Sequence, residues 1–292
     1  MNYIIKNGSR FNDKPSTLAY LSLKTLADGN GNLLDETYTQ KIDVNYIIDI
    51  QNNAAFHNSI FMGRDITGKF SNGSLYTNIT NGTFEDIFVG DYFTASYAGA
   101  NKVFRIAGFN SLYNQGDSNV LTRNHVVIVP DEPLANAAMN TSNSSTNGYA
   151  SMSVRSGAIA TINTNLNATF SGHLITKREL LCNATNSAVS AGMSTTTGSS
   201  SNWAWYDSKS ELMSEMEIYG TSVFNASGYD VASGYSQFPL FALAPEFISM
   251  GYNFWLRGVA NSAKFTICRS DGRADMENAS VSAGIRPRIA IG

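Results

Sequence analysis

The residue types that most often carry chemistry are few and widely separated in this chain. The histidines His57, His125 and His173 lack the spacing of metal ligands, and His125 begins an apolar run, which favours a structural histidine. The cysteines Cys182 and Cys268 have no local motif around them, and such a cysteine is usually a small buried hydrophobe. The sequence therefore predicts no metal site, no cofactor and no cysteine-based active centre.

Three acidic residues offer a further catalytic possibility. Glu211, Glu215 and Glu217 lie close together, as a glycosidase pair could, but on a helix such residues more often form a solvated face. The sequence contains no Gly-x-Ser-x-Gly elbow, phosphate-binding loop or dinucleotide fingerprint. We therefore predict that the protein is not an enzyme.

Binding is the chemistry that the sequence supports better, and two groups of residues suggest it. Near the C-terminus, Phe265 and Ile267 alternate with polar neighbours, as in a strand with one buried face. Lys264, Thr266 and Cys268 are then expected to point outward. Upstream, three aromatic residues follow a long Ser/Thr-rich loop, and aromatic rings stack on sugars and anchor protein contacts. The candidate ligand-binding residues are Lys264, Thr266, Arg273, Asp275, Glu277 and Asn278 in the first group, and Trp203, Trp205 and Tyr206 in the second.

The C-terminal residues 252–292 contain the element that must position the first group. The pair Asp271-Gly272 is typical of a hairpin turn, because glycine accepts positive φ without steric cost. In the last run, 285–291, isoleucines and Pro287 alternate with arginines and Ala290. Pro287 has no N–H to donate, so this strand lies at a sheet edge or enters the sheet there. The sequence therefore predicts an antiparallel ladder that ends the chain.

Strands and helices are both predicted upstream of this ladder. Residues 102–109 have a strand pattern, and 125–129 are apolar throughout, as in a buried central strand. An apolar stripe over 158–170 predicts a helix. Capping boxes at 176–179 and 208–211 predict the starts of two more helices. The fold class is therefore expected to be α+β.

The composition is polar but poor in charge. Charged residues make up 15% of the 292 residues and the net charge is −3, so no basic surface for nucleic acid is expected. The sequence shows no apolar run of about 18 residues, so we expect no membrane insertion. No secretory signal is recognised at the start, and two cysteines make no disulfide framework. Such a surface suits a protein outside the cytosol or within a large assembly.

Several motifs together carry a resemblance to a known family. They are FWLR at 254–257, SDG at 270–272, GIRP at 284–287, FEDIFVGDYF at 84–93 and NHVVIVPDEPL at 124–134. In this combination the chain resembles fibre-like proteins of phages and prophages that end in a C-type-lectin-like domain, including phage tropism determinants. The resemblance covers roughly residues 50 to 292, which is most of the chain.

The resemblance implies a C-type-lectin-like domain, with a small antiparallel sheet, flanking helices and long loops. In that family the terminal ladder holds the fold shut, and its exposed positions face the ligand. Trp255 anchors the ladder, and Arg257 and Arg286 are expected to be structural, with hydrogen bonds to loop carbonyls or to an acid. The calcium-binding motifs of lectins are not matched, because Glu132-Pro133 is followed by Leu134 rather than Asn. We therefore expect no bound metal.

The resemblance also implies a domain plan. We expect an attachment and oligomerisation arm at 1–65, a turn-rich linker at 66–82 and the lectin-like domain at 83–292. The apolar face of the arm is expected to pack on identical arms or on another virion protein, with docking on its own domain as the alternative.

On this plan the protein is a tail or head fibre of a virion, made in the host bacterial cytoplasm. A homotrimer is expected by analogy with fibres. The exposed ladder would recognise a host cell-surface receptor, either glycan or protein. The competing interpretation is a capsid or tail decoration protein with a purely structural role, and a third is an enzyme on the same fold.

Overall fold

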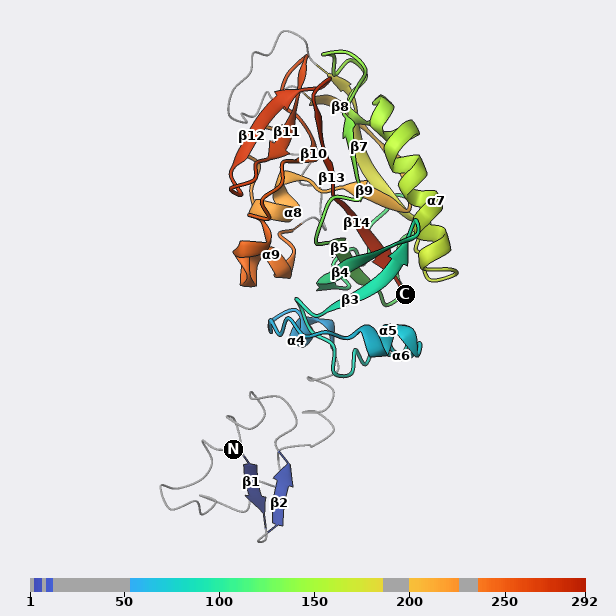
Figure 1. The fold of residues 1–292 in the computed structure, drawn as a ribbon, viewed down its shortest axis with the longest axis vertical. Helices are drawn as coiled ribbons and strands as arrows, with labels where there is room; N and C mark the ends of the chain where they lie inside the picture. The colour runs from blue at the N-terminus through green and yellow to red at the C-terminus, as the bar shows by residue number, and fades with distance from the viewer. Residues whose placement is uncertain (1–2, 7–8, 13–52, 186–199, 226–235) are drawn as a thin grey trace. The chain divides into compact units, whose positions relative to one another are not determined.

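The described part of the chain is mixed α/β, with several antiparallel sheets and few helices (Figure 1). The computed structural model describes residues 3–6, 9–12, 53–185, 200–225 and 236–292. The chain divides into two compact units, Met1–Phe56 and His57–Gly292. The boundary therefore lies ahead of residue 65, where the arm was predicted to end.

In the first unit, β1 (Tyr3–Lys6) pairs antiparallel with β2 (Ser9–Asn12). The short helix α4 (Ala54–His57) crosses the boundary between the units. Most of the predicted arm, including its apolar face, lies outside the described residues.

The first five-stranded sheet of the second unit is antiparallel, in the order β3–β4–β5–β14–β9. β5 lies between β4 and β14 and all of its residues are buried, which confirms the predicted central strand. Ala98 and Gly99 have φ of 50° and 82° and form the hairpin turn between β3 and β4. The strands are β3 (Tyr92–Tyr97), β4 (Ala100–Phe109), β5 (Val126–Pro130), β9 (Ser210–Leu212) and β14 (Pro287–Ile291).

The second five-stranded sheet has the order β12–β11–β10–β13–β6 and contains most of the predicted C-terminal strands. Its pairings are antiparallel except between β10 and β13, which are parallel. The predicted short strands are therefore confirmed, but the single antiparallel ladder is not, because β10 and β13 pair in parallel and residues 287–291 lie in the first sheet. The strands are β6 (Ala135–Ala138), β10 (Phe254–Val259), β11 (Lys264–Cys268), β12 (Ala274–Asn278) and β13 (Ser282–Ile285).

The chain crosses from one sheet to the other at Arg286. This residue alone separates β13, in the second sheet, from β14, in the first. Pro287 is the first residue of β14, so the predicted entry of the strand at this proline is confirmed. The partner strands β5 and β6 make a corresponding crossing between Pro130 and Ala135. The two sheets are therefore joined by one pair of strands that bends between them.

A separate two-stranded ribbon is formed by β7 (Lys177–Thr185) and β8 (Ser200–Ser208). In Figure 1 the ribbon lies between the long helix α7 and the second sheet. The capping box predicted at 176–179 is therefore wrong, because these residues enter a strand. The physical reason lies in Glu179, whose carboxylate binds buried cations instead of capping a helix.

The capping box predicted at 208–211 is also wrong, since these residues lead into β9. The pattern recurs six residues later, where the Ser214 hydroxyl accepts from the Glu217 N–H and the Glu217 carboxylate accepts from the Ser214 N–H. This second box starts α8 (Glu215–Tyr219), which ends at Gly220 with φ of 73°.

The helix predicted at 158–170 is confirmed. A π-helical turn, Arg155–Ile159, leads into α7 (Ala160–Thr169), whose buried side chains include Ile162 and Leu166. The residues predicted to be a linker at 66–82 instead form α5 (Thr67–Ser71) and α6 (Ser74–Thr80). Leu75 and Ile79 on α6 are fully buried, so these residues belong to the core of the second unit. The other helices within the described residues are α9 (Pro239–Leu243) and the 3₁₀ turns Tyr149–Ser151 and Pro245–Phe247.

Gly284, on β13, is expected to tolerate no side chain. A Cβ at this position would lie 2.6 Å from Pro133 Cγ and 2.9 Å from the carbonyl oxygen of Asn253. We expect Gly284→Ala to lower the free energy of unfolding by about 1–3 kcal/mol through overpacking. Urea unfolding checks this. The matched control is Gly157→Ala, because a Cβ at that position would meet no neighbouring group within 4 Å and alanine favours the helix. Equal stability of Gly284→Ala and wild type contradicts the prediction.

Candidate binding site

The pairing of the β7–β8 ribbon decides where its aromatic residues point. Residues paired across a ladder share one face, and neighbours along a strand point to opposite faces. Trp203 pairs with Cys182, and Trp205 pairs with Leu180, so both indoles lie on one face. Tyr206 pairs with Glu179 and lies on the other. The predicted aromatic group is therefore divided between two faces.

The face with the two indoles is called here the tryptophan face. Leu180 is 9% exposed and Cys182 2% exposed, whereas Trp203 and Trp205 are half-buried. The tryptophan rings therefore keep part of their surface in solvent, next to buried apolar neighbours on the same face. The tryptophan face consists of Arg178, Leu180, Cys182, Trp203, Trp205 and Asp207.

A charged group borders the tryptophan face at one end. Arg178 donates to the two carboxylate oxygens of Asp117 at 2.7 and 3.0 Å, and to Asp207 Oδ1 at 3.2 Å. The side chains of Asp117 and Asp207 are 42% and 66% exposed, while that of Arg178 is 18% exposed. The hydrogen bonds from Arg178 lower the pKa of Asp117 below its usual value. Two exposed carboxylates are thus held in place by one half-buried guanidinium group.

The opposite face of the ribbon packs around buried acids. There the guanidinium carbon of Arg155 lies 5.3 Å from the centre of the Tyr206 ring. Arg155 also pairs with Glu211 at 3.2 Å, and the buried hydroxyl of Tyr149 donates to the same carboxylate. Tyr206 therefore contributes to the packing around a buried acid.

Glu179, on this opposite face, is the centre of a buried ionic network. Arg288 Nη1 and Nη2 donate to its two oxygens at 2.7 and 2.5 Å, Lys177 Nζ lies at 2.8 Å, and Arg257 Nη1 lies at 3.4 Å. Arg288 Nε also lies 2.6 Å from Glu217 Oε1. All five side chains are at most 2% exposed. Burial alone would raise the pKa of Glu179, but the surrounding cations hold it well below its usual value.

The three glutamates considered as a catalytic pair or a solvated face are buried. Glu211, Glu215 and Glu217 are each 0% exposed. Glu215 accepts from the backbone N–H groups of Val223, Phe224 and Asn225 at 2.8–3.1 Å. The predicted solvated face is therefore wrong, because every one of these carboxylates binds a buried donor.

The β11–β12 pair divides the first predicted group in the same way. Asp275 pairs with Ile267 and Glu277 with Phe265, so the two acids share the face of those apolar residues. Lys264 pairs with Asn278 on the other face. The predicted ligand-binding residues therefore do not form one continuous surface.

Arg269 organises the acids of this hairpin. Its Nε lies 2.8 Å from Asp275 Oδ2, and its Nη2 lies 3.1 Å from Glu277 Oε2. Partial burial raises the pKa of Asp275, but the hydrogen bonds from Arg269 and the Met276 N–H, with the positive charges of Arg269 and Arg273, together lower it. Arg273, which is 66% exposed, lies 3.9 Å from Asp275. This charged group, Arg269, Arg273, Asp275 and Glu277, is called here the hairpin cluster.

The expectation that Thr266 and Cys268 point into solvent is wrong. Both are 0% exposed, because β11 is covered on this face as well. A Cβ on Gly258 would lie 2.7 Å from the Asn225 side chain and 2.8 Å from Thr266 Oγ1, so these groups are close-packed. Cys268 lies near Tyr219 of α8, and burial raises its pKa to about 11. Glu215, which holds residues 223–225, therefore helps to cover the predicted ligand-binding position Thr266.

The three residues predicted to be structural lie in the interior. The Trp255 indole Nε1 donates to the Ala137 carbonyl at 3.0 Å, which ties β10 to β6. Arg257 donates to Glu179, as an arginine bound to an acid was expected to do. Arg286, at the crossing between the sheets, donates to the carbonyls of Pro130 and Phe247, both at 2.9 Å.

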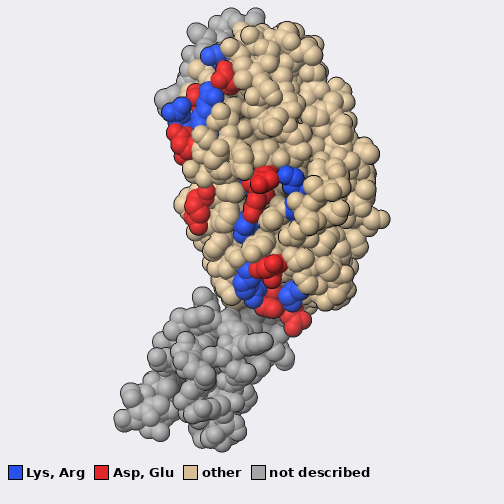
Figure 2. All heavy atoms as spheres, viewed as in Figure 1, with Lys and Arg blue, Asp and Glu red and all other residues tan. Residues whose placement is uncertain are grey.

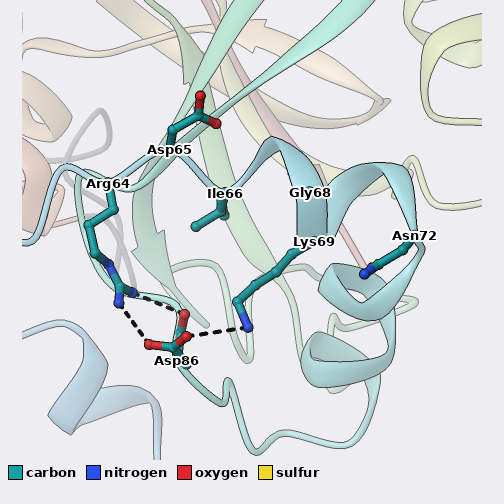
Figure 3. A pocket seen from close by; sticks show the side chains of 7 residues that line it. All are labelled: Arg64, Asp65, Ile66, Gly68, Lys69, Asn72 and Asp86. Carbon is teal, nitrogen blue, oxygen red and sulfur yellow. Dashed lines mark hydrogen bonds and ion pairs between the residues drawn. The ribbon is translucent and has the colours of Figure 1, made fainter.

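An open surface pocket of about 360 Å³ lies beside α5 (Figure 3). Figure 3 shows Arg64 and Lys69 converging on Asp86, at 2.7 and 3.5 Å, while Asp65 points away. Arg64 also binds the buried Asp91 at 2.7 Å, and this hydrogen bond raises the pKa of Arg64. Each cation of the pocket is thus already neutralised by a carboxylate. The lining residues are Arg64, Asp65, Ile66, Gly68, Lys69, Asn72 and Asp86.

Charged side chains form small groups on the face drawn in Figure 2, and most of these groups contain both signs of charge. One of these groups lies over β12 and corresponds to the hairpin cluster. Within the described residues, no group of three or more His, Cys, Asp or Glu could hold a metal ion. No helix in the same part of the chain is long and apolar enough to cross a membrane.

Sequence reasoning missed Arg178, Asp117 and Arg269 as members of these surfaces. Arg178 was assigned to a predicted helix start, and its partner Asp117 lies 61 residues away in the sequence. Arg269 precedes the predicted turn at Asp271-Gly272, and the acids Asp275 and Glu277 follow it. Opposite charges on the two sides of a predicted hairpin could therefore have identified this cluster from the sequence.

Comparisons of the chain with protein-family models, with curated proteins and with solved structures found no match.

Proposed function

We propose that this protein is a structural component of a bacteriophage or prophage virion. In this proposal the second unit has a C-type-lectin-like fold and recognises a receptor on the host cell surface. The N-terminal arm attaches the protein to other virion proteins and forms a homotrimer. In this proposal the protein has no catalytic activity and needs no cofactor.

The observation that carries the proposal is where the residues of the resemblance lie. The FWLR motif, 254–257, forms β10 at the centre of the second sheet, and the GIRP motif, 284–287, makes the crossing between the sheets. Arg257 and Arg286 each bind groups far away in the sequence, Glu179 and Pro130. A motif held by such long-range bonds is a requirement of the fold, which supports a shared architecture with the resembled family.

The surface also suits display outside a cell. Charge is limited to 15% of residues, and the described acids and bases largely neutralise each other in pairs. Such a surface gives little long-range attraction for nucleic acid or other strongly charged molecules. The half-buried indoles and the hairpin cluster instead offer short-range contacts of the kind that recognition uses.

The test is binding of the purified, fluorescently labelled full-length protein to a panel of bacterial strains. We expect selected strains to be bound and others not. A surface variant, Lys264→Ala with Asp271→Ala and Arg273→Ala, is expected to weaken binding if the hairpin contacts the receptor. Asp271 and Arg273 are 61% and 66% exposed and Lys264 is half-buried, so the variant removes no fully buried side chain.

The outcome also separates the competing class of protein. A capsid or tail decoration protein binds virus particles but not cells. If no strain is bound while the protein still assembles on particles, host recognition is wrong and the structural role stands.

A further inference from the structure

We infer that the tryptophan face binds a neutral polysaccharide of the bacterial cell surface. This inference rests on the proposed function, because host recognition is the reason for expecting the ligand on a bacterial cell. It gives the ligand class, and it assigns the contact to the β7–β8 ribbon rather than to the hairpin cluster.

The first argument is the spacing of the rings and the packing beside them. Trp203 and Trp205 stand two residues apart on one strand, which places them about 7 Å apart along the ribbon. That separation is of the order of one sugar unit. Leu180 and Cys182, their partners across the ladder, lie beside the rings on the same face and are buried, so the rings are flanked by packed side chains. Aromatic rings of this kind offer apolar surface at low entropic cost, and the C–H face of a sugar ring is the matching surface.

The second argument is the fixed set of hydrogen-bonding groups beside the rings. Asp117 and Asp207 are 42% and 66% exposed and are oriented by Arg178. A carboxylate has about four acceptor sites, so each acid keeps lone pairs for sugar hydroxyl groups after binding Arg178. Because Arg178 already holds both acids, a ligand loses little entropy in ordering them.

The charge of the face decides between classes of polysaccharide. Two carboxylates stand against one guanidinium group, so the tryptophan face has a net negative charge. An anionic polymer is repelled, whereas a neutral sugar chain can use both the rings and the acceptors. Among the described surfaces, the hairpin cluster and the pocket beside α5 are built from charged pairs. The tryptophan face combines rings with exposed acceptors, which favours it for a sugar ligand.

The test is native gel electrophoresis of the full-length protein through gels that contain one polysaccharide each. The probes are dextran, mannan, a galactan and the neutral polysaccharide extracted from a bacterial strain that the protein binds. Tryptophan fluorescence gives a second readout. Of the three tryptophans, Trp255 is 0% exposed, so a change on binding reports Trp203 or Trp205. We expect retardation by at least one neutral probe, with a matching change in fluorescence.

The variants test the site. We expect Trp205→Ala to weaken binding at least about tenfold, and Trp205→Phe to restore part of it. Asp207→Ala removes an exposed acceptor without touching the core and is expected to weaken binding by a smaller factor. Thermal unfolding shows whether each variant is folded. If Trp205→Ala is not folded, Asp207→Ala still tests the site. The matched control, Tyr252→Ala, removes a 42% exposed aromatic residue on another element and is expected to bind as wild type.

The possible results separate the inference from the proposed function. Binding of a neutral polysaccharide that Trp205→Ala and Asp207→Ala leave unchanged overturns the site. Binding to cells without binding to any neutral probe overturns the ligand class and leaves host recognition standing. Failure to bind both cells and polysaccharides overturns both proposals.

Discussion

Replacing Glu179 by Gln is expected to lower the free energy of unfolding by roughly 3–5 kcal/mol, because the change leaves buried cations without their carboxylate. Glu179 is fully buried and binds Lys177, Arg257 and Arg288. A glutamine oxygen can still accept hydrogen bonds, but it carries no charge to balance theirs. Urea unfolding followed by circular dichroism gives the free-energy difference.

The size of this effect follows from the buried position of Glu179 between three strands and not from the number of its ion pairs. Glu179 joins the ribbon, through β7, to β10 through Arg257 and to β14 through Arg288. One carboxylate thus holds three elements that are distant in sequence. The matched control is Glu132→Gln, which breaks an exposed pair with Lys102 at 2.9 Å. Exposed pairs contribute about 0–1 kcal/mol, so this variant is expected to unfold almost as wild type. Equal losses in the two variants would show that burial of the network contributes nothing.

The same network explains why part of the fold was predictable from the sequence and part was not. The short terminal strands and β5 were predicted because local alternation and apolar runs specify strands by themselves. The capping boxes at 176–179 and 208–211 failed because the pattern states only that a Ser or Thr precedes a Glu. Glu179 is bound by Arg288, 109 residues away, and such a partner leaves no local signal.

The candidate site was predictable to a similar extent. The aromatic residues Trp203 and Trp205 were identified from residue type alone. Their separation from Tyr206 follows from strand alternation, but only once β8 is known to be a strand. Thr266 was misplaced because the segment that covers β11 is held by Glu215, and nothing near Thr266 in the sequence indicates that cover. Local patterns thus identified side chains, and long-range packing determined which of them reach solvent.

His125 is expected to make the protein lose stability between pH 6.5 and pH 5. Its Nε2 accepts from the Leu112 N–H at 3.0 Å, and its Nδ1 donates to the Arg123 carbonyl at 3.0 Å, so the neutral ring satisfies both neighbours. A protonated ring would lose the bond to Leu112 and would place a charge at a site that is 0% exposed. Burial, the largest cause, lowers the pKa of His125 from 6.5 to about 4.

The sign of the pH effect follows from proton uptake. Between pH 6.5 and about 4 the unfolded chain binds a proton at His125 and the folded chain does not. Stability therefore falls as pH falls, by up to about 1.4 kcal/mol for each pH unit, and by about 1.5 kcal/mol between pH 6.5 and 5. This window lies above the usual titration range of carboxylates, so Glu179 and the other acids contribute little to the slope there.

Urea unfolding at half-unit steps from pH 7 to pH 5 checks this prediction. We expect His125→Gln to be less stable than wild type at pH 7, because the bonds to Leu112 and Arg123 are lost or weakened, but to show a much flatter pH dependence. The matched control is His173→Gln, which removes a half-buried histidine stacked on Tyr76 and should keep the wild-type slope. A slope that survives in His125→Gln assigns the acid sensitivity to another group and contradicts the role given to His125.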